Sequence, residues 1–207
     1  MRRSLTLIRH GLTDWNVSGR FQGQSDLPLS EAGRRQARRL ARRTMRMRKA
    51  DVVVSSPLSR AYETATIAFP NAEITTDARL MELNFGIFEG GTLEENRRRP
   101  EWERWIADPF DNATPCGESY RDLRERSVAW FASLPEGPGE VVAITHSGTI
   151  QMLLAYVLGL DRPRWRKRIY LRHSSVSRII MQGEEMIVER VNDTRHLDED
   201  GTDPFWE

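Results

Sequence analysis

This chain of 207 residues has little cysteine and no long apolar run. Its single cysteine, Cys116, excludes an internal disulfide and is typical of a reducing compartment. No run of about 18 apolar residues could span a bilayer. The apolar run 5–8, near the N-terminus, is too short for the core of a signal peptide. These absences predict a cytoplasmic protein without a membrane partner.

An excess of charge of either sign is also lacking. The 31 basic and 30 acidic side chains leave a net charge of +1, which argues against nucleic acid as the main partner. Most of the basic residues are arginines, and many of them fall in the segment 31–47. They could form a basic patch or the solvated face of an amphipathic helix. No aromatic residues interleave with them, and this favours the solvated face.

Short apolar runs alternate with segments of helical periodicity along the chain. We expect strands at 5–8, 52–54 and 141–144, and a closing antiparallel hairpin of strands at about 176–181 and 186–191. We expect helices at about 31–47, 59–69, 119–134 and 149–158. This alternation predicts an α/β fold, a three-layer α/β/α sandwich with a mostly parallel central sheet.

The segment 84–118 fits this alternation poorly, because it is rich in aromatic residues, proline and glycine. We interpret it as an excursion over the active site rather than a second domain, so that residues 1–207 form a single domain. The acidic residues 198–207 are expected to form a loose tail.

The stretch Arg9-His10-Gly11 is the most informative part of the sequence. It places an arginine and a histidine where an apolar run gives way to a glycine, which is typical of a buried strand leading into a tight loop. Such a loop can hold a histidine against a ligand while the sheet behind it stays rigid. Because Arg9 cannot lose its charge, we expect His10 to attack an anionic group. The motif predicts phosphate chemistry at His10.

Three further segments end an apolar run or open a helix, where an α/β sheet presents its ligand groups. Arg60 falls in the first turn of the second expected helix. His146 ends the third long strand, and Ser147 follows where backbone N–H groups can bind an anion. Glu82 is a lone carboxylate between apolar neighbours. Taken singly, Arg60 could be an exposed helix arginine, His146 a helix cap and Glu82 a surface glutamate.

Together these motifs resemble the histidine phosphatase superfamily, in its phosphoglycerate-mutase-like branch, over nearly the whole chain and in the right order. The matching motifs are Arg9-His10-Gly11 with Thr13, Trp15 and Asn16; Arg20-Phe21-Gln22-Gly23; Pro28-Leu29-Ser30-Glu31 with Gly33; Ser55-Ser56-Pro57-Leu58 with Arg60; Glu82 with Phe85-Gly86 and Glu89-Gly90; Gly117-Glu118-Ser119; His146-Ser147-Gly148; and Asn192-Asp193-Thr194 with His196-Leu197.

The resemblance implies a phosphatase that hydrolyses phosphomonoesters of small organic metabolites through a phosphohistidine intermediate on His10. It implies that Arg9, Arg60 and His146 surround the phosphoryl oxygens and that Glu82 acts as general acid and then general base. The remaining phosphate-binding residues that it implies are Thr13, Asn16, Gln22, Gly23 and the N–H of Ser147. We expect no metal and no cofactor, because an arginine-rich site repels cations and no metal-ligand spacing is present.

Two alternatives stay open within this resemblance: a cofactor-dependent phosphoglycerate mutase and a phospho-ligand binding module without catalysis. The cationic insertion of the mutases is not evident after Glu82, although Arg97-Arg98-Arg99 could replace it in part. The segment 102–110 is aromatic, and we expect it to line an open mouth that admits water and substrates with a bulky apolar part. This favours a phosphatase over a mutase. Retention of His10, Glu82 and His146 counts against a binding module.

Three details of the sequence remain open. His173 stands where relatives are expected to carry a small polar residue, and we expect a surface or supporting role for it. Cys116 is expected to be an unremarkable free thiol, although it could lie near the mouth of the site. The partner is a small-molecule phosphate ester, and the sequence leaves a homodimer open.

Overall fold

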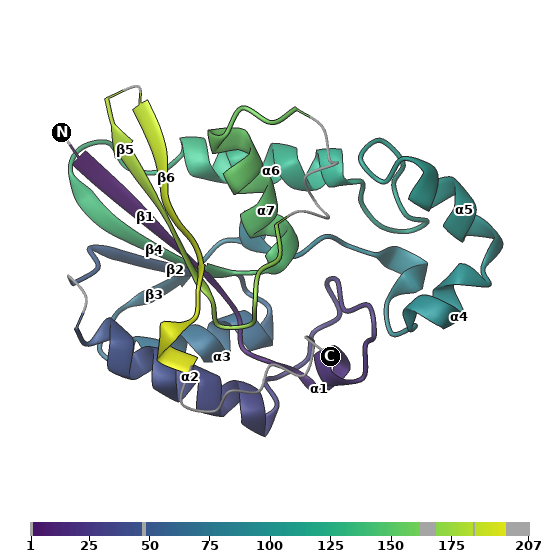
Figure 1. Cartoon of the computed structure of the whole chain (residues 1–207), viewed down its shortest axis with the longest axis horizontal. Coiled ribbons are helices and arrows are strands. Elements are labelled where there is room, and N and C mark those ends of the chain that lie inside the picture. Colours follow the sequence, from purple (N-terminus) through teal and green to yellow (C-terminus); the bar gives the residue numbers. More distant parts are fainter. Residues whose placement is uncertain (1, 47–48, 162–168, 184, 198–207) are drawn as a thin grey trace.

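The computed structural model describes residues 2–46, 49–161, 169–183 and 185–197 (Figure 1). One mixed sheet has the strand order β3-β2-β4-β1-β5-β6. Its strands are β1 (Arg2–Arg9), β2 (Val52–Ser55), β3 (Ile74–Thr76), β4 (Gly139–Thr145), β5 (Val176–Gln182) and β6 (Glu185–Asp193). From β3 to β1 neighbouring strands pair in parallel, whereas β5 is antiparallel to both β1 and β6. The mostly parallel sheet and the closing hairpin are therefore confirmed.

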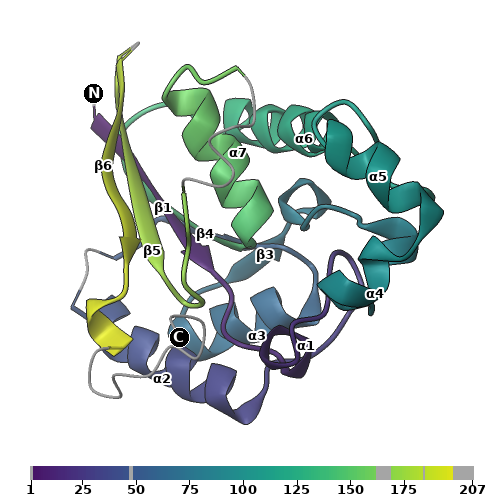
Figure 2. The same cartoon turned by 45° about the vertical axis from the view of Figure 1, so that its right-hand side comes forward.

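Helices cover both faces of this sheet (Figures 1 and 2). One face carries α6 (Tyr120–Ala132) and α7 (Ser147–Val157), and the other carries α2 (Glu31–Thr44) and α3 (Ser59–Ala68). Successive residues of β1 point to opposite faces, as in any strand. Leu7 belongs to the same hydrophobic cluster as Leu154 of α7, and Ile8 belongs to the same cluster as Leu40 of α2. All four side chains are fully buried, and each such burial contributes about 1.5–3 kcal/mol. The three-layer α/β/α architecture is confirmed.

The predicted helices are present, with different ends. The hydroxyl of Ser30 caps α2 by accepting the N–H of Gly33, as the sequence predicts, but α2 ends at Thr44. Helix α7 begins at Ser147, two residues earlier than expected, because His146 has extended backbone angles and forms the N-cap. Ser119 caps α6 through a reciprocal capping box with Asp122.

The segment 84–118 contains more regular structure than expected. It forms η2 (Gly86–Phe88), α4 (Leu93–Arg97) and α5 (Pro100–Ala107), which lie beyond one end of the three layers (Figure 1). Phe88, Trp102 and Trp105 are buried together in a hydrophobic cluster that also includes Leu123 of α6 and Met152 of α7. The expectation of an open aromatic mouth is therefore wrong, because most of these rings pack against one another. Among the described aromatic rings of this cluster, Phe21 and Phe85 are half-buried at its edge.

The remaining short elements are α1 (Asp14–Val17), η1 (Ala78–Leu80) and η4 (Arg195–Leu197). The expected tail, 198–207, lies outside the described residues. In the part of the chain that the structure describes, every helix is too short or too polar to cross a bilayer.

Candidate active site

His10 is the first residue after β1, and the sheet fixes its position. Its backbone N–H donates to the carbonyl oxygen of Thr145, at the end of β4, over 3.0 Å. Its side chain is buried, with 3% of the residue exposed. The imidazole therefore lies where the carboxyl ends of two neighbouring parallel strands meet, which is the usual ligand position in an α/β sheet.

The environment of His10 selects one neutral form of its ring. Nδ1 lies 2.6 Å from the carbonyl oxygen of Gly11, so Nδ1–H donates and Nε2 carries the free lone pair. Burial lowers the pKa of His10 well below 6.5, and the charges of Arg60 and Arg9 lower it further. His10 is thus a neutral imidazole at neutral pH, with Nε2 available as a nucleophile.

The loop after β1 is joined directly to helix α3. The N–H of Gly11 donates to the hydroxyl of Thr64 over 3.1 Å, and that hydroxyl donates to the carbonyl oxygen of Arg60 over 2.7 Å. Thr64 is fully buried. One hydroxyl therefore links the backbone beside the nucleophile to the backbone that carries Arg60.

Arg60 is a buried arginine, with 1% of the residue exposed. Its guanidinium donates to the carbonyl oxygens of Ser25 and Gly23, over 3.0 and 2.6 Å. Burial lowers its pKa to about 10, while the charge of Glu82 opposes that shift. Arg60 stays cationic at neutral pH, and no carboxylate among the described residues lies within ion-pair distance of it. Its Nε has no hydrogen-bond partner there either.

His146 lies beside His10, with ring centroids 5.0 Å apart. Its Nε2 is 2.8 Å from the hydroxyl of Ser56, and both residues are fully buried. Nδ1 is buried without a hydrogen-bond partner among the described residues. Burial lowers the pKa of His146 well below 6.5, and the charge of Arg60 adds to this effect. Ser56 was missed in the sequence, although it falls within a matching motif.

Glu82 is held at the N-terminus of α7. Its carboxylate accepts the N–H of Leu83 over 2.9 Å and the N–H of Gly148 over 3.1 Å. A Cβ at position 148 would lie 2.2 Å from Oε1 of Glu82, so any other residue there would displace the carboxylate from this position. Ser147, the first residue of α7, stands between Gly148 and His146. The structure thus brings Glu82 to the same helix start as His146.

The polar residues predicted to bind phosphate form a small network. The hydroxyl of Thr13 donates to Oε1 of Gln22 over 3.0 Å, and the amide of Asn16 contacts the same oxygen over 3.3 Å. The amide nitrogen of Gln22 is buried and has no hydrogen-bond partner among the described residues. Gly23, with φ +52°, follows directly and offers its carbonyl oxygen to Arg60.

His173 belongs to this cluster, so the surface position that the sequence allowed is wrong, whereas its contact with Arg9 agrees with the supporting role that was the other expectation. It is 5% exposed, and its ring centroid lies 5.7 Å from that of His10. Arg9 donates to Nε2 of His173 over 2.7 Å and to the carbonyl oxygen of Leu171. Burial, together with the charge of Arg9, lowers the pKa of His173 well below 6.5. Spacing could not reveal this contact, because the two residues are 164 positions apart.

In the described part of the chain, Glu89 and Cys116 have no contact with the cluster around His10 that suggests a catalytic role. Glu89, the nearest rival of Glu82 in sequence, accepts the N–H groups of Gln24, Ser25 and Phe85 and so shapes the loop before Asp26. Cys116 is exposed in a turn with φ 60°. Among the described residues, no three His, Cys, Asp or Glu side chains group as metal ligands would.

Comparison with known proteins agrees with this geometry. The family described as the histidine phosphatase superfamily (branch 1) matches residues 5–194. A probable phosphoglycerate mutase GpmB of Salmonella arizonae is 36% identical over 205 residues, covering 93% of this chain and 94% of that protein. The solved structure of YhfR from Bacillus stearothermophilus has a TM-score of 0.86 and 30% identity, covering 95% of this chain and 100% of that one.

A mycobacterial glucosyl-3-phosphoglycerate phosphatase is also similar in structure. Its TM-score is 0.79 at 29% identity, and the match covers 93% of this chain and 99% of that one. The family match spans nearly the whole chain, including every residue of the cluster around His10. The chain belongs to the histidine phosphatase superfamily, branch 1.

Proposed function

We propose that this enzyme hydrolyses phosphomonoesters of small organic metabolites through a phosphohistidine on His10. The observation that carries the proposal is a neutral His10 in a site with three buried nitrogens that have no hydrogen-bond partner among the described residues: Arg60 Nε, His146 Nδ1 and Gln22 Nε2. Burying a polar atom without a hydrogen-bond partner destabilises the fold by about 1–3 kcal/mol, so a group of such atoms in one place indicates a bound ligand. A phosphoryl group supplies the oxygen acceptors and the negative charge that fit them.

In the first step, Nε2 of His10 attacks phosphorus while the bond from phosphorus to the ester oxygen breaks. Arg9, Arg60 and His146 stabilise the charge on the phosphoryl oxygens, assisted by Asn16, Gln22, Gly23, Thr13 and the N–H of Ser147. Glu82 gives its proton to the departing alkoxide, which leaves as an alcohol. General acid catalysis of this kind contributes about 10²–10⁴-fold.

In the second step, water attacks the phosphorus of phosphohistidine. Glu82 takes a proton from that water as the bond from phosphorus to Nε2 breaks, and orthophosphate is released. Glu82 then carries the proton needed for the next turnover, so the cycle closes. In this scheme the positive charge comes from arginine, and neither a metal ion nor a cofactor takes part.

The partner of this site is a small-molecule phosphate ester. A related solved structure is described as a phosphoserine phosphatase in complex with phosphoserine, and another as a glucosyl-3-phosphoglycerate phosphatase. Both names describe phosphate esters of small polar metabolites. The burial of Trp102 and Trp105 removes the ground for expecting a bulky apolar substrate. We therefore expect phosphate esters of small polar metabolites to be the preferred substrates.

Rapid quenching during turnover of a radiolabelled phosphomonoester tests the proposal. We expect an acid-labile, base-stable label on the peptide that contains His10. The His10→Ala variant should lose label and turnover together while its circular dichroism spectrum stays native. Label on another side chain, or normal turnover by His10→Ala, would overturn the proposal.

A second candidate function is phosphoglycerate mutase, because relatives 36% identical to this chain are named as probable mutases. The two functions share His10 and differ in whether water reaches the phosphohistidine. Conversion of 3-phosphoglycerate to 2-phosphoglycerate, measured with and without bisphosphoglycerate, separates them. A mutase rate above the rate of phosphate release would favour the second candidate. Binding of phosphate without either activity would indicate a binding module.

A further inference from the structure

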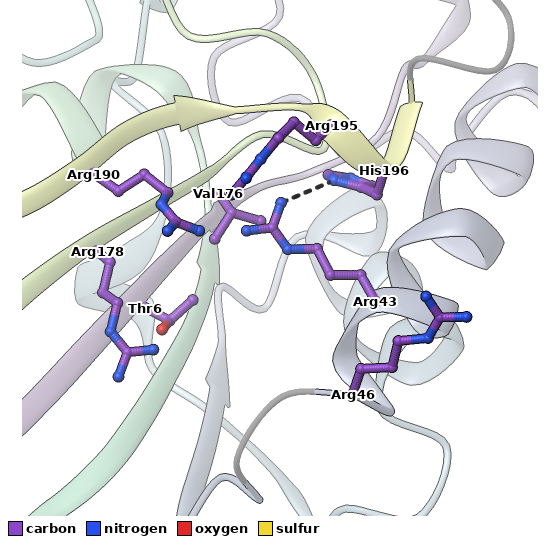
Figure 3. A pocket seen from close by; sticks show the side chains of 8 residues that line it. All are labelled: Thr6, Arg43, Arg46, Val176, Arg178, Arg190, Arg195 and His196. Atoms are coloured by element: carbon purple, nitrogen blue, oxygen red, sulfur yellow. Dashed lines mark hydrogen bonds between the residues drawn. The ribbon is translucent and has the colours of Figure 1, made fainter.

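A cavity of about 570 Å³ lies between the end of α2, the hairpin β5–β6 and η4 (Figure 3). Its walls carry six basic side chains: Arg43, Arg46, Arg178, Arg190, Arg195 and His196. Thr6 and Val176 complete the lining. None of these residues belongs to the cluster around His10, so this arginine cavity is separate from the candidate active site.

Three of the arginines share one carboxylate. Asp193, whose side chain is 6% exposed, lies 2.9 Å from Arg43, 2.9 Å from Arg190 and 2.7 Å from Arg195. These contacts hold the pKa of Asp193 far below its usual range, chiefly through Arg195 and Arg43. One negative charge therefore faces three positive charges, each of which has more N–H donors than Asp193 can accept.

Among the described residues, two further carboxylates face Arg178. Its guanidinium lies 2.8 Å from Glu140 and 3.2 Å from Glu189. Glu140 is buried and also accepts the hydroxyl hydrogen of Thr6 over 2.8 Å, so its charge is held within the sheet. Arg46 has no ion pair with a described residue. Across the part of the chain that the structure describes, the arginines that line the cavity outnumber the carboxylates paired with them, which are Asp193, Glu140 and Glu189.

Helix α2 has the solvated arginine face that the sequence predicts, which carries the exposed residues Arg35, Arg38 and Arg42. Arg43 departs from this pattern, because its side chain is only 17% exposed and lies 2.9 Å from Asp193. Its guanidinium also contacts His196 (Figure 3). Arg46, one turn further along the chain, faces the same cavity. Arg43 and Arg46 thus line a hollow that they share with β5, β6 and η4.

We propose that the arginine cavity is a binding site for a compact polyanion of the di- or triphosphate class. Guanidinium groups bind phosphate through paired N–H donors. Several guanidinium groups around one hollow, among them that of Arg46, which has no ion pair with a described residue, favour a ligand with more than one phosphate group. A volume of about 570 Å³ lies within the ~300–1,000 Å³ range of small-molecule sites. The openness of the rim, where Arg190 is 42% exposed, suits a ligand that exchanges with solvent.

Calorimetric titration with inorganic tripolyphosphate at constant ionic strength tests this site. The variant R46Q/R190Q removes two rim charges and keeps Arg43 on Asp193. We expect its Kd to be at least tenfold higher than that of the unmodified protein. The control is Arg42→Gln, because Arg42 is an exposed arginine of α2 that does not line the cavity. Its Kd should stay within twofold.

The outcomes separate this cavity from the phosphate site at His10. Any tripolyphosphate bound near His10 survives in R46Q/R190Q, so the proposal requires that a component of binding be lost in that variant. Equal affinity and stoichiometry in the unmodified protein and in R46Q/R190Q would overturn it. Equal weakening by Arg42→Gln would overturn it too, since that result shows only a general charge effect. The single variant Arg46→Gln repeats the test if the double variant is not folded.

Discussion

The arginines in the two basic regions of this protein differ in their burial and in the groups that accept their hydrogen bonds. In the candidate active site, Arg60 is buried and donates to two backbone carbonyl oxygens. In the arginine cavity, Arg43 and Arg190 are more exposed and share the carboxylate of Asp193. Carbonyl groups fix the position of a guanidinium without cancelling its charge, whereas a carboxylate cancels much of it. A buried arginine held by carbonyls therefore indicates an anionic ligand more strongly than an arginine in an ion pair.

The largest expected effect concerns Arg60. Replacing it in Arg60→Gln removes the uncancelled charge, and we expect kcat/KM for an aryl phosphate to fall about 10³-fold, as for loss of a transition-state donor. Steady-state kinetics with the matched control Arg42→Gln check this. The control should change kcat/KM by less than twofold. A loss below tenfold in Arg60→Gln would show that its charge does not face the reacting group.

Glu82→Gln is expected to lower kcat about 10²-fold for an alkyl phosphate, because the leaving alkoxide then receives no proton. The loss should be much smaller for a nitrophenyl phosphate, whose leaving group needs little protonation. The exposed Glu125→Gln, on α6, is the control with the same change of charge. Equal losses with both substrates would assign Glu82 to positioning rather than proton transfer.

Asp193→Asn tests the arginine cavity, where the carboxylate of Asp193 stabilises the fold by pairing with arginines. Removing one partner from a buried ion pair costs about 3–5 kcal/mol. Asp193 and Arg43 are largely buried, whereas Arg190 and Arg195 are 42% and 72% exposed and are partly screened by water, so the low end of this range applies. We expect the free energy of unfolding, measured with urea, to fall by about 3 kcal/mol. Turnover at a temperature where the variant is folded should be retained. Unchanged stability would mean that the arginines find other acceptors.

The smallest expected effect is the pH dependence of stability. Burial lowers the pKa of His173 below 6.5 in the folded protein, so the unfolded chain binds the extra proton. The stability that depends on neutral His173 is thus complete above pH 6.5 and is lost as the pH falls toward the folded pKa, by up to about 1.4 kcal/mol per pH unit. His173→Asn should make unfolding in urea less sensitive to pH between 7 and 5.5. The same slope in both proteins would contradict this.

The sequence predicted most of the layered core, because its elements carry their own patterns. The apolar runs in β1, β2 and β4 are β-branched or aliphatic, and the helices have clear caps such as Ser30 and Ser119. The edge strand β3 was missed since it has three residues, of which only Ile74 is partly buried. Helix α5 was missed although Trp102 and Trp105 have helical spacing, because the prolines around them suggested irregular structure.

For the candidate site, the order of the motifs along the chain predicted which residues take part. The contacts between these residues could be seen only in the structure. The pairing of Arg9 with His173 and of His146 with Ser56 joins positions far apart in the chain. No periodicity encodes such contacts, since they depend on how the strand ends meet. The arginine cavity was hidden for the same reason, because it combines one end of α2 with a hairpin more than 130 residues later.

The hydroxyl of Thr64 has a mechanical consequence. It accepts a hydrogen bond from the N–H of Gly11 and donates one to the carbonyl oxygen of Arg60. The backbone beside His10 is therefore hydrogen-bonded to the helix that carries Arg60. Thermal motion of α3 then carries both together and leaves their separation nearly constant. Valine has almost the same shape as threonine and cannot make either bond. Thr64→Val would uncouple the two without opening a void, and the alignment of attack would become subject to the independent motions of loop and helix.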